Sequence, residues 1–358
     1  MSPRFSTTGV IATYNQSAFV AEAVASLADQ VDELVVVDDA SSDDTVAVLG
    51  GLPHSNLRLV RNERRLGVSR SFNVGVEMGT GEIVVIQGGD DRSTPDRVER
   101  QLRSFDDPHV VLSASVPRVL NEFGAVLPDW CASEFFPDTR IPDTLVHLFS
   151  LGNLICAPSV SLRRSDYLDL GGFHAGLDHL QDYHLWLRLA ERGTFDILPV
   201  PVVEYRKHTT NLSRVHLDID SPRSRRIWTE TEFVLTDFLE RSRPETLVRL
   251  GAAGGVEPER FSRLVHEEQV GLLELLHQNR LLVRRGLAFV LRRLGEKDGE
   301  ESLARMGLSV EDVDRLAVRA DPMNGEDVGR ALAVREKLDE SSTRGEARKN
   351  AARRGRTA

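Results

Sequence analysis

The stretch "IVVIQGGDDRSTP", residues 83–95, decides the fold of this chain. Four apolar residues and a glutamine are followed by two glycines and two adjacent acids, Asp90 and Asp91. A short apolar run without alternating polar residues is typical of a strand that is buried on both faces. Because adjacent carboxylates repel each other, Asp90 and Asp91 need a compensating partner where the strand stops, which is a metal, a ligand or bulk water.

Three similar runs precede this stretch, and helical segments separate them. The runs are GVIAT (9–13), ELVVVDD (33–39) and LRLVRN (57–62). The segment after the first run has one apolar helical stripe, formed by Phe19, Val20, Ala23, Val24 and Leu27. Strands that alternate with helices predict an α/β fold with a doubly wound, Rossmann-like parallel sheet, in which ligands bind outside the carboxyl ends of the strands.

The pattern changes after Pro95. The segment HVVLSASVPRVLNEFGAVLP (109–128) contains NEFG (121–124), which is typical of a hairpin turn. We therefore expect a mixed sheet, in which an antiparallel section joins the parallel core. A helix over 181–193 and two short strands within 195–206 complete this part of the chain.

Beyond residue 220 the strand patterns disappear and helical periodicity takes over. The chain is therefore expected to divide into a catalytic domain over 1–220, a helical C-terminal region over 221–340 and a basic tail over 341–358. The tail has no apolar periodicity, so we expect it to be disordered. The helical region is a candidate surface for oligomer formation or for an acceptor.

Composition narrows the class of protein. The 358 residues carry a net charge of −10, which argues against general nucleic-acid binding but allows one local anion site. The two cysteines, Cys131 and Cys156, lack metal-ligand spacing and are consistent with a reducing compartment. No apolar stretch approaches the ~18 residues of a membrane span. We expect a cytoplasmic protein, with a peripheral contact at the inner face of the membrane if the basic tail binds anionic lipid.

Polar clusters follow the first, second and fourth runs, and so are expected at one edge of the sheet. They are TYN (13–15), the pair Asp38 and Asp39, and GGDD (88–91). Hard cations such as Mg²⁺ and Mn²⁺ prefer carboxylate oxygens and take one or two from the protein together with substrate phosphates. Each cluster alone is equally compatible with a solvated loop, and the helix after Asp39 is expected to take Ser42 as its N-cap.

Two further groups lie in the second half of the predicted domain. Asp182 is at the start of a helix, where the dipole favours the carboxylate that a general base requires. Arg206, Lys207 and His208 form a compact cationic group that suits a diphosphate. An ordinary helix-start acid and a solvated charge run are the alternatives.

In this order the motifs TYN, DDASSDDT, GVSRSFNVGVEMGTGE, GGDD, QDYHLWLRL and YRKH resemble the family 2 glycosyltransferases, whose catalytic domain has the GT-A fold. The resemblance covers residues 8–215 and leaves the helical third uncovered. Two positions depart from the family pattern. Gly88 and Gly89 stand where the family often has a D-x-D aspartate, so the motif is only DXD-like, and Ala12 stands where proline is frequent.

The resemblance implies a role for each motif residue. Thr13, Tyr14 and Asp39 would hold the nucleobase, with Asn15 in the same nucleotide-binding set. Arg70 would lie near the base or the diphosphate, and Asn73 would support that wall. The remaining roles are ribose contact for Asp90, ligation of a divalent cation (Mn²⁺ or Mg²⁺) for Asp91, general base for Asp182, and assistance at the diphosphate or metal for His208.

The expected activity is that of an inverting, metal-dependent glycosyltransferase. It would move a sugar from a nucleoside diphosphate donor, of the UDP or dTDP type, to a hydroxyl of a glycan, lipid-linked or small-molecule acceptor in cell-surface polysaccharide, glycolipid or glycoconjugate synthesis. A weakly catalytic partner protein that binds a nucleotide sugar is one alternative. A sugar-1-phosphate nucleotidyltransferase is another, although no glycine-rich basic loop follows the first run.

Overall fold

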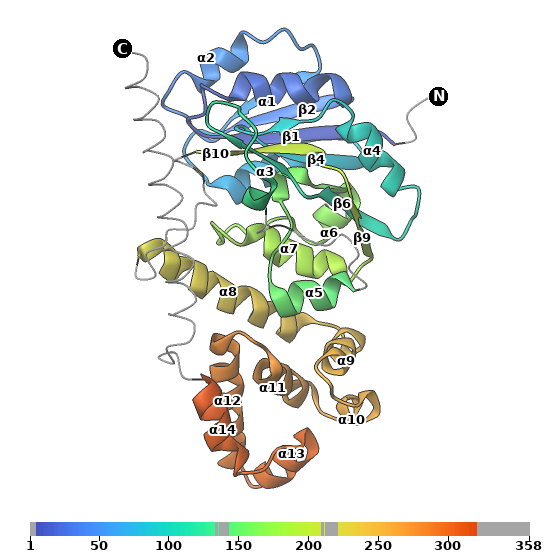
Figure 1. Ribbon diagram of the computed structural model, residues 1–358, viewed down its shortest axis with the longest axis vertical. Coiled ribbons are helices and arrows are strands. Elements are labelled where there is room, and N and C mark those ends of the chain that lie inside the picture. Colours follow the sequence, from blue (N-terminus) through green and yellow to red (C-terminus); the bar gives the residue numbers. More distant parts are fainter. Residues whose placement is uncertain (1–4, 133–134, 136–142, 209–210, 212–220, 321–358) are drawn as a thin grey trace, which may run out of the picture. The chain divides into compact units, whose positions relative to one another are not determined.

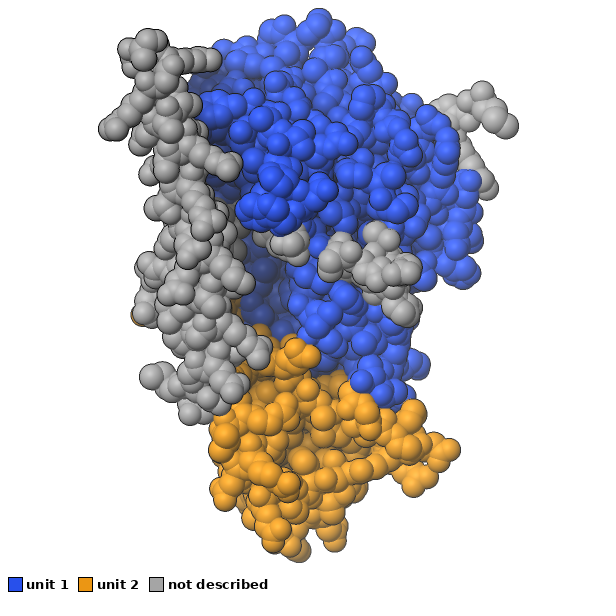
Figure 2. Space-filling view, in the orientation of Figure 1, with its two compact units in different colours: residues 1–214, 229–253 blue, residues 215–228, 254–358 orange. Residues whose placement is uncertain are grey.

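The computed structural model describes residues 5–132, 135, 143–208, 211 and 221–320 (Figure 1). The chain divides into two compact units (Figure 2). The first unit comprises residues 1–214 and 229–253, and the second comprises residues 215–228 and 254–358. The polar clusters all belong to the first unit.

A seven-stranded sheet forms the centre of the first unit, in the order β3-β2-β1-β4-β8-β6-β9. Its strands are β1 (Thr7–Thr13), β2 (Glu33–Asp38), β3 (Leu57–Arg61), β4 (Ile83–Gly88), β6 (Val110–Ser115), β8 (Ser161–Arg163) and β9 (Thr194–Leu198). The strands β3, β2, β1 and β4 are parallel, whereas β8 is antiparallel to both β4 and β6. The predicted α/β class, with a parallel core and an antiparallel section, is confirmed.

Helices cover both faces of this sheet. They are α1 (Val20–Leu27), α2 (Thr45–Gly50), α3 (Val68–Met78), α4 (Arg97–Ser104), α5 (Thr144–Leu151), α6 (Arg164–Asp169) and α7 (Gln181–Ala190). Successive residues of β1 show that α1 and α3 lie on opposite faces. A Cβ at Gly9 would meet Leu27 of α1, and Val10 lies against Gly75 of α3. Figure 1 shows this layering around β1.

The close approach of α3 to β1 gives a stability prediction for Gly75→Ala. The added Cβ would overlap Val10 Cγ1 and would stand 3.3 Å from Val37 Cγ2, and valine side chains have little rotamer freedom. We expect this overpacking to cost about 1–3 kcal/mol, more than the roughly 1 kcal/mol that alanine gains over glycine in a helix.

Gly50→Ala in α2 is the matched control, because its Cβ would meet no atom within 4 Å. Urea unfolding of both variants measures the difference. A Gly75→Ala variant as stable as Gly50→Ala would contradict the packing argument.

A second, three-stranded sheet has the order β5-β10-β7, with β5 (Arg92–Ser93), β7 (Arg118–Asn121) and β10 (Val203–Lys207). The predicted turn at 121–124 is present, because Gly124 N–H donates to Asn121 O and Leu120 bridges Val126 in antiparallel fashion. This hairpin belongs to the small sheet. The antiparallel section of the large sheet is instead supplied by β8.

The predicted N-cap Ser42 is wrong by two residues. The helix α2 begins at Thr45, with Asp44 in the N-cap position, and the Asp43 carboxylate accepts from Thr45 N–H at 3.0 Å. Ser42 instead donates its backbone N–H to Asn15 Oδ1 at 2.8 Å. A contact between two loops thus takes precedence over the local capping preference.

The first unit also includes residues beyond the predicted boundary at 220. Most of α8 (Pro222–Arg241) and all of α9 (Pro244–Ala253) belong to it through residues 229–253. Val234, Leu235, Phe238 and Leu239 give α8 a buried face, and the Phe238 ring lies 6.2 Å from that of Phe149 on α5. Helical periodicity shows that α8 is amphipathic but does not show which core it joins.

The second unit is helical, as expected for the C-terminal region. Its helices are α10 (Pro258–Ser262), α11 (His266–Leu276), α12 (Arg280–Leu294), α13 (Gly299–Met306) and α14 (Asp312–Ala320). The buried Glu268 accepts from Ser302 Oγ at 2.6 Å and pairs with Arg305 at 2.5 Å, which links α11 to α13. The predicted end of this region and the basic tail, 321–358, lie outside the described residues.

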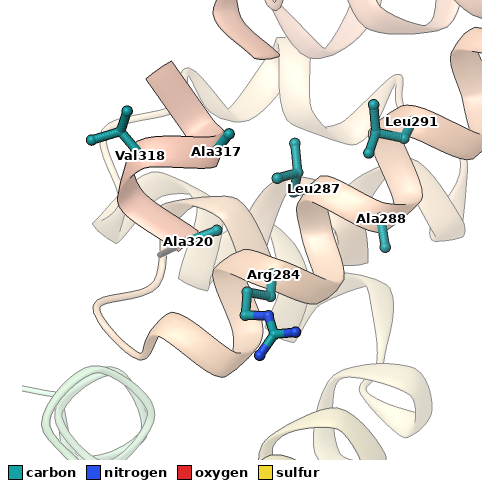
Figure 3. A pocket seen from close by; sticks show the side chains of 7 residues that line it. All are labelled: Arg284, Leu287, Ala288, Leu291, Ala317, Val318 and Ala320. Carbon is teal, nitrogen blue, oxygen red and sulfur yellow. The ribbon is translucent and has the colours of Figure 1, made fainter. Parts of the chain in front are cut away.

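A shallow apolar groove runs between α12 and α14 (Figure 3). Its lining residues are Arg284, Leu287, Ala288, Leu291, Ala317, Val318 and Ala320. None of them belongs to the polar clusters of the sheet edge. Across the described residues, no helix has both the length and the apolar composition that crossing a bilayer would require.

Candidate active site

The register of the parallel strands brings three of the predicted clusters to one sheet edge. Thr13 of β1 is paired with Asp38 of β2, and Ala12 is paired with Gly88 of β4. The residues that follow each strand therefore leave the sheet side by side. This is the edge at which doubly wound sheets bind their ligands.

The Asp39 carboxylate organises the loop that enters α3. Oδ1 accepts from Asn62 Nδ2 at 2.8 Å and from Leu66 N–H at 2.7 Å, and Oδ2 accepts from Gly67 N–H at 2.9 Å. Oδ2 therefore keeps the capacity for a second donor. The neighbouring Asp38 Oδ1 is buried and has no hydrogen-bond partner among the described residues.

The residues after β1 divide between shaping the loop and facing outward. Thr13 is buried and bonds to Gln16 at 2.9 Å, while Asn15 holds the β2–α2 loop through Ser42 and adopts a positive φ of 52°. Tyr14 is partly exposed, and the Arg65 guanidinium lies 4.2 Å from its ring centroid. Of these three residues, Tyr14 offers a flat surface on which a base could stack.

Asp90 and His208 face each other across the two sheets. His208 Nε2 is 2.8 Å from Asp90 Oδ2, and Asn211 Nδ2 is 3.4 Å from the same oxygen. Both side chains are largely buried, with 6% of His208 and 13% of Asp90 exposed. The strand β10 runs antiparallel to β5, with Val203 opposite Ser93 and Glu204 opposite Arg92. The residues that follow β10, including His208, therefore lie near those that precede β5, including Asp90.

Asp91, the predicted metal ligand, points into the protein. Its Oδ1 accepts from Arg206 N–H at 2.9 Å, and the side chain is only 2% exposed. Burial raises the pKa of this carboxyl well above its ordinary value, and the Asp90 charge raises it further. The structure therefore presents Asp90, predicted as the ribose contact, opposite His208, and gives Asp91 an anchoring contact to β10.

The geometry at Gly88 tests whether a divalent cation fits. A Cβ added there would lie 2.7 Å from both Asp90 Oδ1 and Asp91 Oδ2, so oxygens of the two carboxylates converge beside this glycine. Among the described residues, no group of three or more acidic, histidine or cysteine side chains forms a complete cation site. Hard cations take one or two carboxylate oxygens from the protein and complete their coordination with phosphate oxygens and water, so Asp90 Oδ1 beside Gly88 is a ligand of the kind that such a cation uses.

Arg206, one of the predicted cations, is used within the protein. Its guanidinium pairs with Glu22 of α1 at 2.6 Å and donates to Asp90 O at 2.9 Å. Lys207 Nζ donates to Cys131 O at 2.9 Å. The predicted cationic group is thus separated by the structure, and His208 is the member that faces Asp90.

Arg70 and Asn73 lie on α3 in different surroundings. Arg70 is exposed in the first turn. Asn73 instead holds the loop before α7, since Oδ1 accepts from Tyr167 OH at 2.5 Å and from Phe173 N–H at 2.9 Å, and Nδ2 donates to Phe173 O at 2.9 Å.

Asp182 is the second residue of α7. Its Oδ1 accepts from Tyr183 N–H at 2.7 Å and its Oδ2 from Asn153 Nδ2 at 2.9 Å. The carboxyl group is partly accessible, but protein atoms surround it closely enough that desolvation raises its pKa to about 6. The two hydrogen bonds oppose this rise, and the Glu230 charge adds to it. Such a group is a carboxylate at neutral pH and a stronger base than an exposed aspartate.

Asn62, Asn153 and Glu230 support the predicted residues, and no sequence motif includes them. Asn62 ends a strand run and Asn153 follows a glycine, so both read as ordinary loop residues. Glu230 lies beyond the domain boundary that the sequence predicts at residue 220. No local pattern marks any of them, because their roles depend on contacts between distant segments.

The mixed sheet, with a parallel core, an antiparallel section and polar residues gathered at one edge of the core, is that of the GT-A fold. The family model for glycosyl transferase family 2 matches residues 8–169. An uncharacterised protein of Mycobacterium tuberculosis is 32% identical over 221 residues, which cover 57% of this chain and 68% of that protein. The chain belongs to the family 2 glycosyltransferases.

Two further similarities agree with this membership. An uncharacterised glycosyltransferase of Methanocaldococcus jannaschii is 26% identical over 206 residues, or 55% of this chain and 69% of that protein. The structure of Staphylococcus aureus TarS 1–349 in complex with UDP aligns with a TM-score of 0.53 at 17% identity, covering 88% of this chain and 90% of that one. At this identity the structural similarity shows the shared fold.

Proposed function

We propose that this protein transfers a sugar, with inversion, from a nucleoside diphosphate sugar to an acceptor hydroxyl, and that Asp182 is the general base. The observation that carries the proposal is the Asp182 carboxylate at the start of α7, held by Tyr183 N–H and Asn153, in the same unit as the facing pair Asp90 and His208. The acceptor oxygen forms a bond to the anomeric carbon, its proton passes to Asp182, and the bond from that carbon to the diphosphate oxygen breaks.

The leaving group requires positive charge. When bound, a divalent cation such as Mn²⁺ or Mg²⁺ neutralises the charge that develops on the diphosphate. Asp90 and His208 would hold it, and Arg70 is the exposed cation that we assign to the diphosphate or base. Asp91 fixes β10 and so keeps His208 opposite Asp90. This assignment moves the metal-ligand role by one residue from Asp91, which the sequence pattern suggested.

The donor base is assigned to Tyr14 and Asp39. A partly exposed aromatic ring suits stacking, and the unused capacity of Asp39 Oδ2 suits the N3–H of uracil or thymine. Thr13 and Asn15 shape the loop from which Tyr14 projects. The UDP bound to TarS, which shares the fold, supports a donor of the UDP or dTDP type.

The acceptor is proposed as a hydroxyl of a glycan or lipid-linked molecule in cell-surface polysaccharide or glycoconjugate synthesis. The two cysteines, Cys131 and Cys156, lie far apart in the sequence and lack metal-ligand spacing, which supports a reducing, cytoplasmic location. The helical unit is the proposed surface for an oligomer or for a peripheral membrane contact.

Nucleotide binding tests the donor assignment directly. Thermal unfolding with UDP, dTDP and GDP, each with and without Mn²⁺, is expected to show the largest rise in Tm for UDP or dTDP with Mn²⁺. A ligand present at 100 times its Kd adds about 2.7 kcal/mol to the free energy of unfolding. Absence of stabilisation by any nucleotide would refute the proposal, and binding without sugar turnover would favour a non-catalytic nucleotide-sugar-binding protein.

A further inference from the structure

Glu230 is a buried carboxylate on α8 whose oxygens are occupied by the segment that leads into α7. Oε1 accepts from Asp178 N–H at 3.0 Å, and Oε2 accepts from His179 N–H at 2.9 Å and Leu180 N–H at 3.0 Å. The side chain is 4% exposed. Three consecutive backbone donors thus converge on one carboxylate from a helix 50 residues away along the chain.

The helix α7 has no cap of its own. Leu180 occupies the N-cap position, and an aliphatic side chain cannot accept a hydrogen bond from the first turn. The free N–H groups at and before a helix N-terminus attract negative charge. Glu230 supplies that charge from outside the helix and accepts from three backbone N–H groups at this point.

The same segment is also fastened from α3. The Asn73 side chain bonds to both the backbone N–H and the backbone carbonyl of Phe173. Ser69 Oγ donates to Leu177 O at 2.8 Å. Residues 173–180 are therefore fixed at one end by α3 and at the other by α8. Asp182 follows two residues later, so its direction depends on how this segment enters α7.

We propose that Glu230 is a positioning residue for Asp182, an inference that rests on the proposed function. Glu230 fixes the three residues ahead of α7, and this fixes the backbone from which the Asp182 carboxylate projects toward the acceptor. The contact with Asn153 then sets the carboxylate plane. The helix α8, which lies beyond the segment matched by the family, is thereby part of the catalytic apparatus.

The charge of Glu230 has a second effect at the same place. It raises the pKa of Asp182, in the same direction as burial, which is the larger cause. Other ionisable groups on the surrounding elements include His174, Asp178 and His179 in the loop, His147 on α5, Tyr183, His184 and Arg188 on α7, and Glu232, Asp237, Glu240 and Arg241 on α8. Removing the Glu230 charge is therefore expected to lower the pKa of Asp182 and to move the acid limb of kcat/KM to lower pH.

Two variants separate position from charge. Glu230→Gln keeps the shape and can accept at one oxygen, and Glu230→Ala leaves all three N–H groups without this acceptor. We expect Glu230→Ala to lower kcat at least about 10-fold, because small misplacements of a catalytic group are costly, with the nucleotide Kd within twofold. Glu230→Gln is expected to recover part of kcat and to show the shifted acid limb.

Asp237→Asn is the matched control. Asp237 is another carboxylate on α8 that binds α7, through His184 Nε2 at 2.9 Å, but it does not contact residues 178–180. We expect it to reduce thermal stability while kcat stays within twofold and the acid limb stays in place.

Hydrogen exchange of residues 174–184 measures how firmly Glu230 holds this segment, independently of activity. Faster exchange in Glu230→Ala than in Asp237→Asn, together with the kcat loss, supports the proposal. A folded Glu230→Ala or Glu230→Gln variant with wild-type kcat and an unshifted acid limb overturns it. A fully active Asp182→Asn variant would refute the proposed function instead, and hydrogen exchange would still report whether Glu230 orders this segment.

Discussion

Replacement of Asp182 by asparagine is expected to lower kcat by about 10²–10⁴-fold, which is the contribution typical of general base catalysis. The asparagine retains the size and one acceptor of the carboxyl group but cannot take the acceptor proton. Nucleotide affinity is expected to remain within twofold, because neither Asp90 nor Tyr14 is altered. Steady-state kinetics and calorimetric titration with UDP and Mn²⁺ measure the two quantities.

The pH dependence follows from the same carboxyl group. The base acts when deprotonated and its pKa is about 6, so wild-type kcat/KM should rise through pH 6 and level off above it. The free energy of unfolding changes with pH in the opposite direction. Because the folded-state pKa is raised above the unfolded value, folding favours the protonated form, and that contribution is lost as pH rises through 6. Asp182→Asn should therefore unfold at a higher temperature than wild type at pH 8 and not at pH 4.

Asp166→Asn provides the comparison, because Asp166 forms a 3.2 Å ion pair with Arg192 on the surface of the same unit. It should change neither kcat nor the position of the acid limb. If Asp182→Asn retained more than a tenth of wild-type kcat, the base would have to be assigned to another residue.

Asp90→Asn and His208→Ala are expected to lower kcat/KM by about 10²–10³-fold, the cost typical of losing one preorganised charge-stabilising group. Both should weaken the dependence of UDP binding on Mn²⁺, because each removes one of the proposed protein ligands. Titration of UDP at several Mn²⁺ concentrations measures the coupling between the two ligands.

Asp91→Asn distinguishes the two assignments of the metal ligand. The structure predicts retained Mn²⁺ coupling, since Asp91 Oδ1 accepts from the backbone N–H of Arg206 and an asparagine oxygen can accept in its place. The pattern inferred from sequence predicts the reverse, with coupling lost in Asp91→Asn and kept in Asp90→Asn. The second outcome would restore Asp91 as the ligand.

The sequence predicted the parallel core well because its strands are short apolar runs separated by amphipathic helices. Each of β1, β2 and β4 was located to within two residues of its observed limits. The positions of these strands can be predicted because the apolar pattern of each strand is local in the sequence. The register of the strands then places residues 13–15, 39 and 88–91 at the same edge of the sheet.

The roles of individual site residues were harder to predict from the sequence. The order of Asp90 and Asp91 in the chain does not tell which carboxylate points outward, because that depends on where β10 pairs. Asn73 was expected at the nucleotide wall, and its bonds to Phe173 come from a loop 100 residues away. Glu230 had no sequence signal at all, since an acid within an amphipathic helix is commonplace.

The membership of α8 and α9 in the first unit has a practical consequence for truncation. A recombinant fragment that stops at the end of the family match, residue 169, would contain β1 to β8 but neither Asp182 nor His208. One that stops at residue 214 would regain both but would leave residues 178–180 without Glu230. The first unit is thus encoded in two pieces, residues 1–214 and 229–253, and the shortest fragment that contains both ends at Ala253.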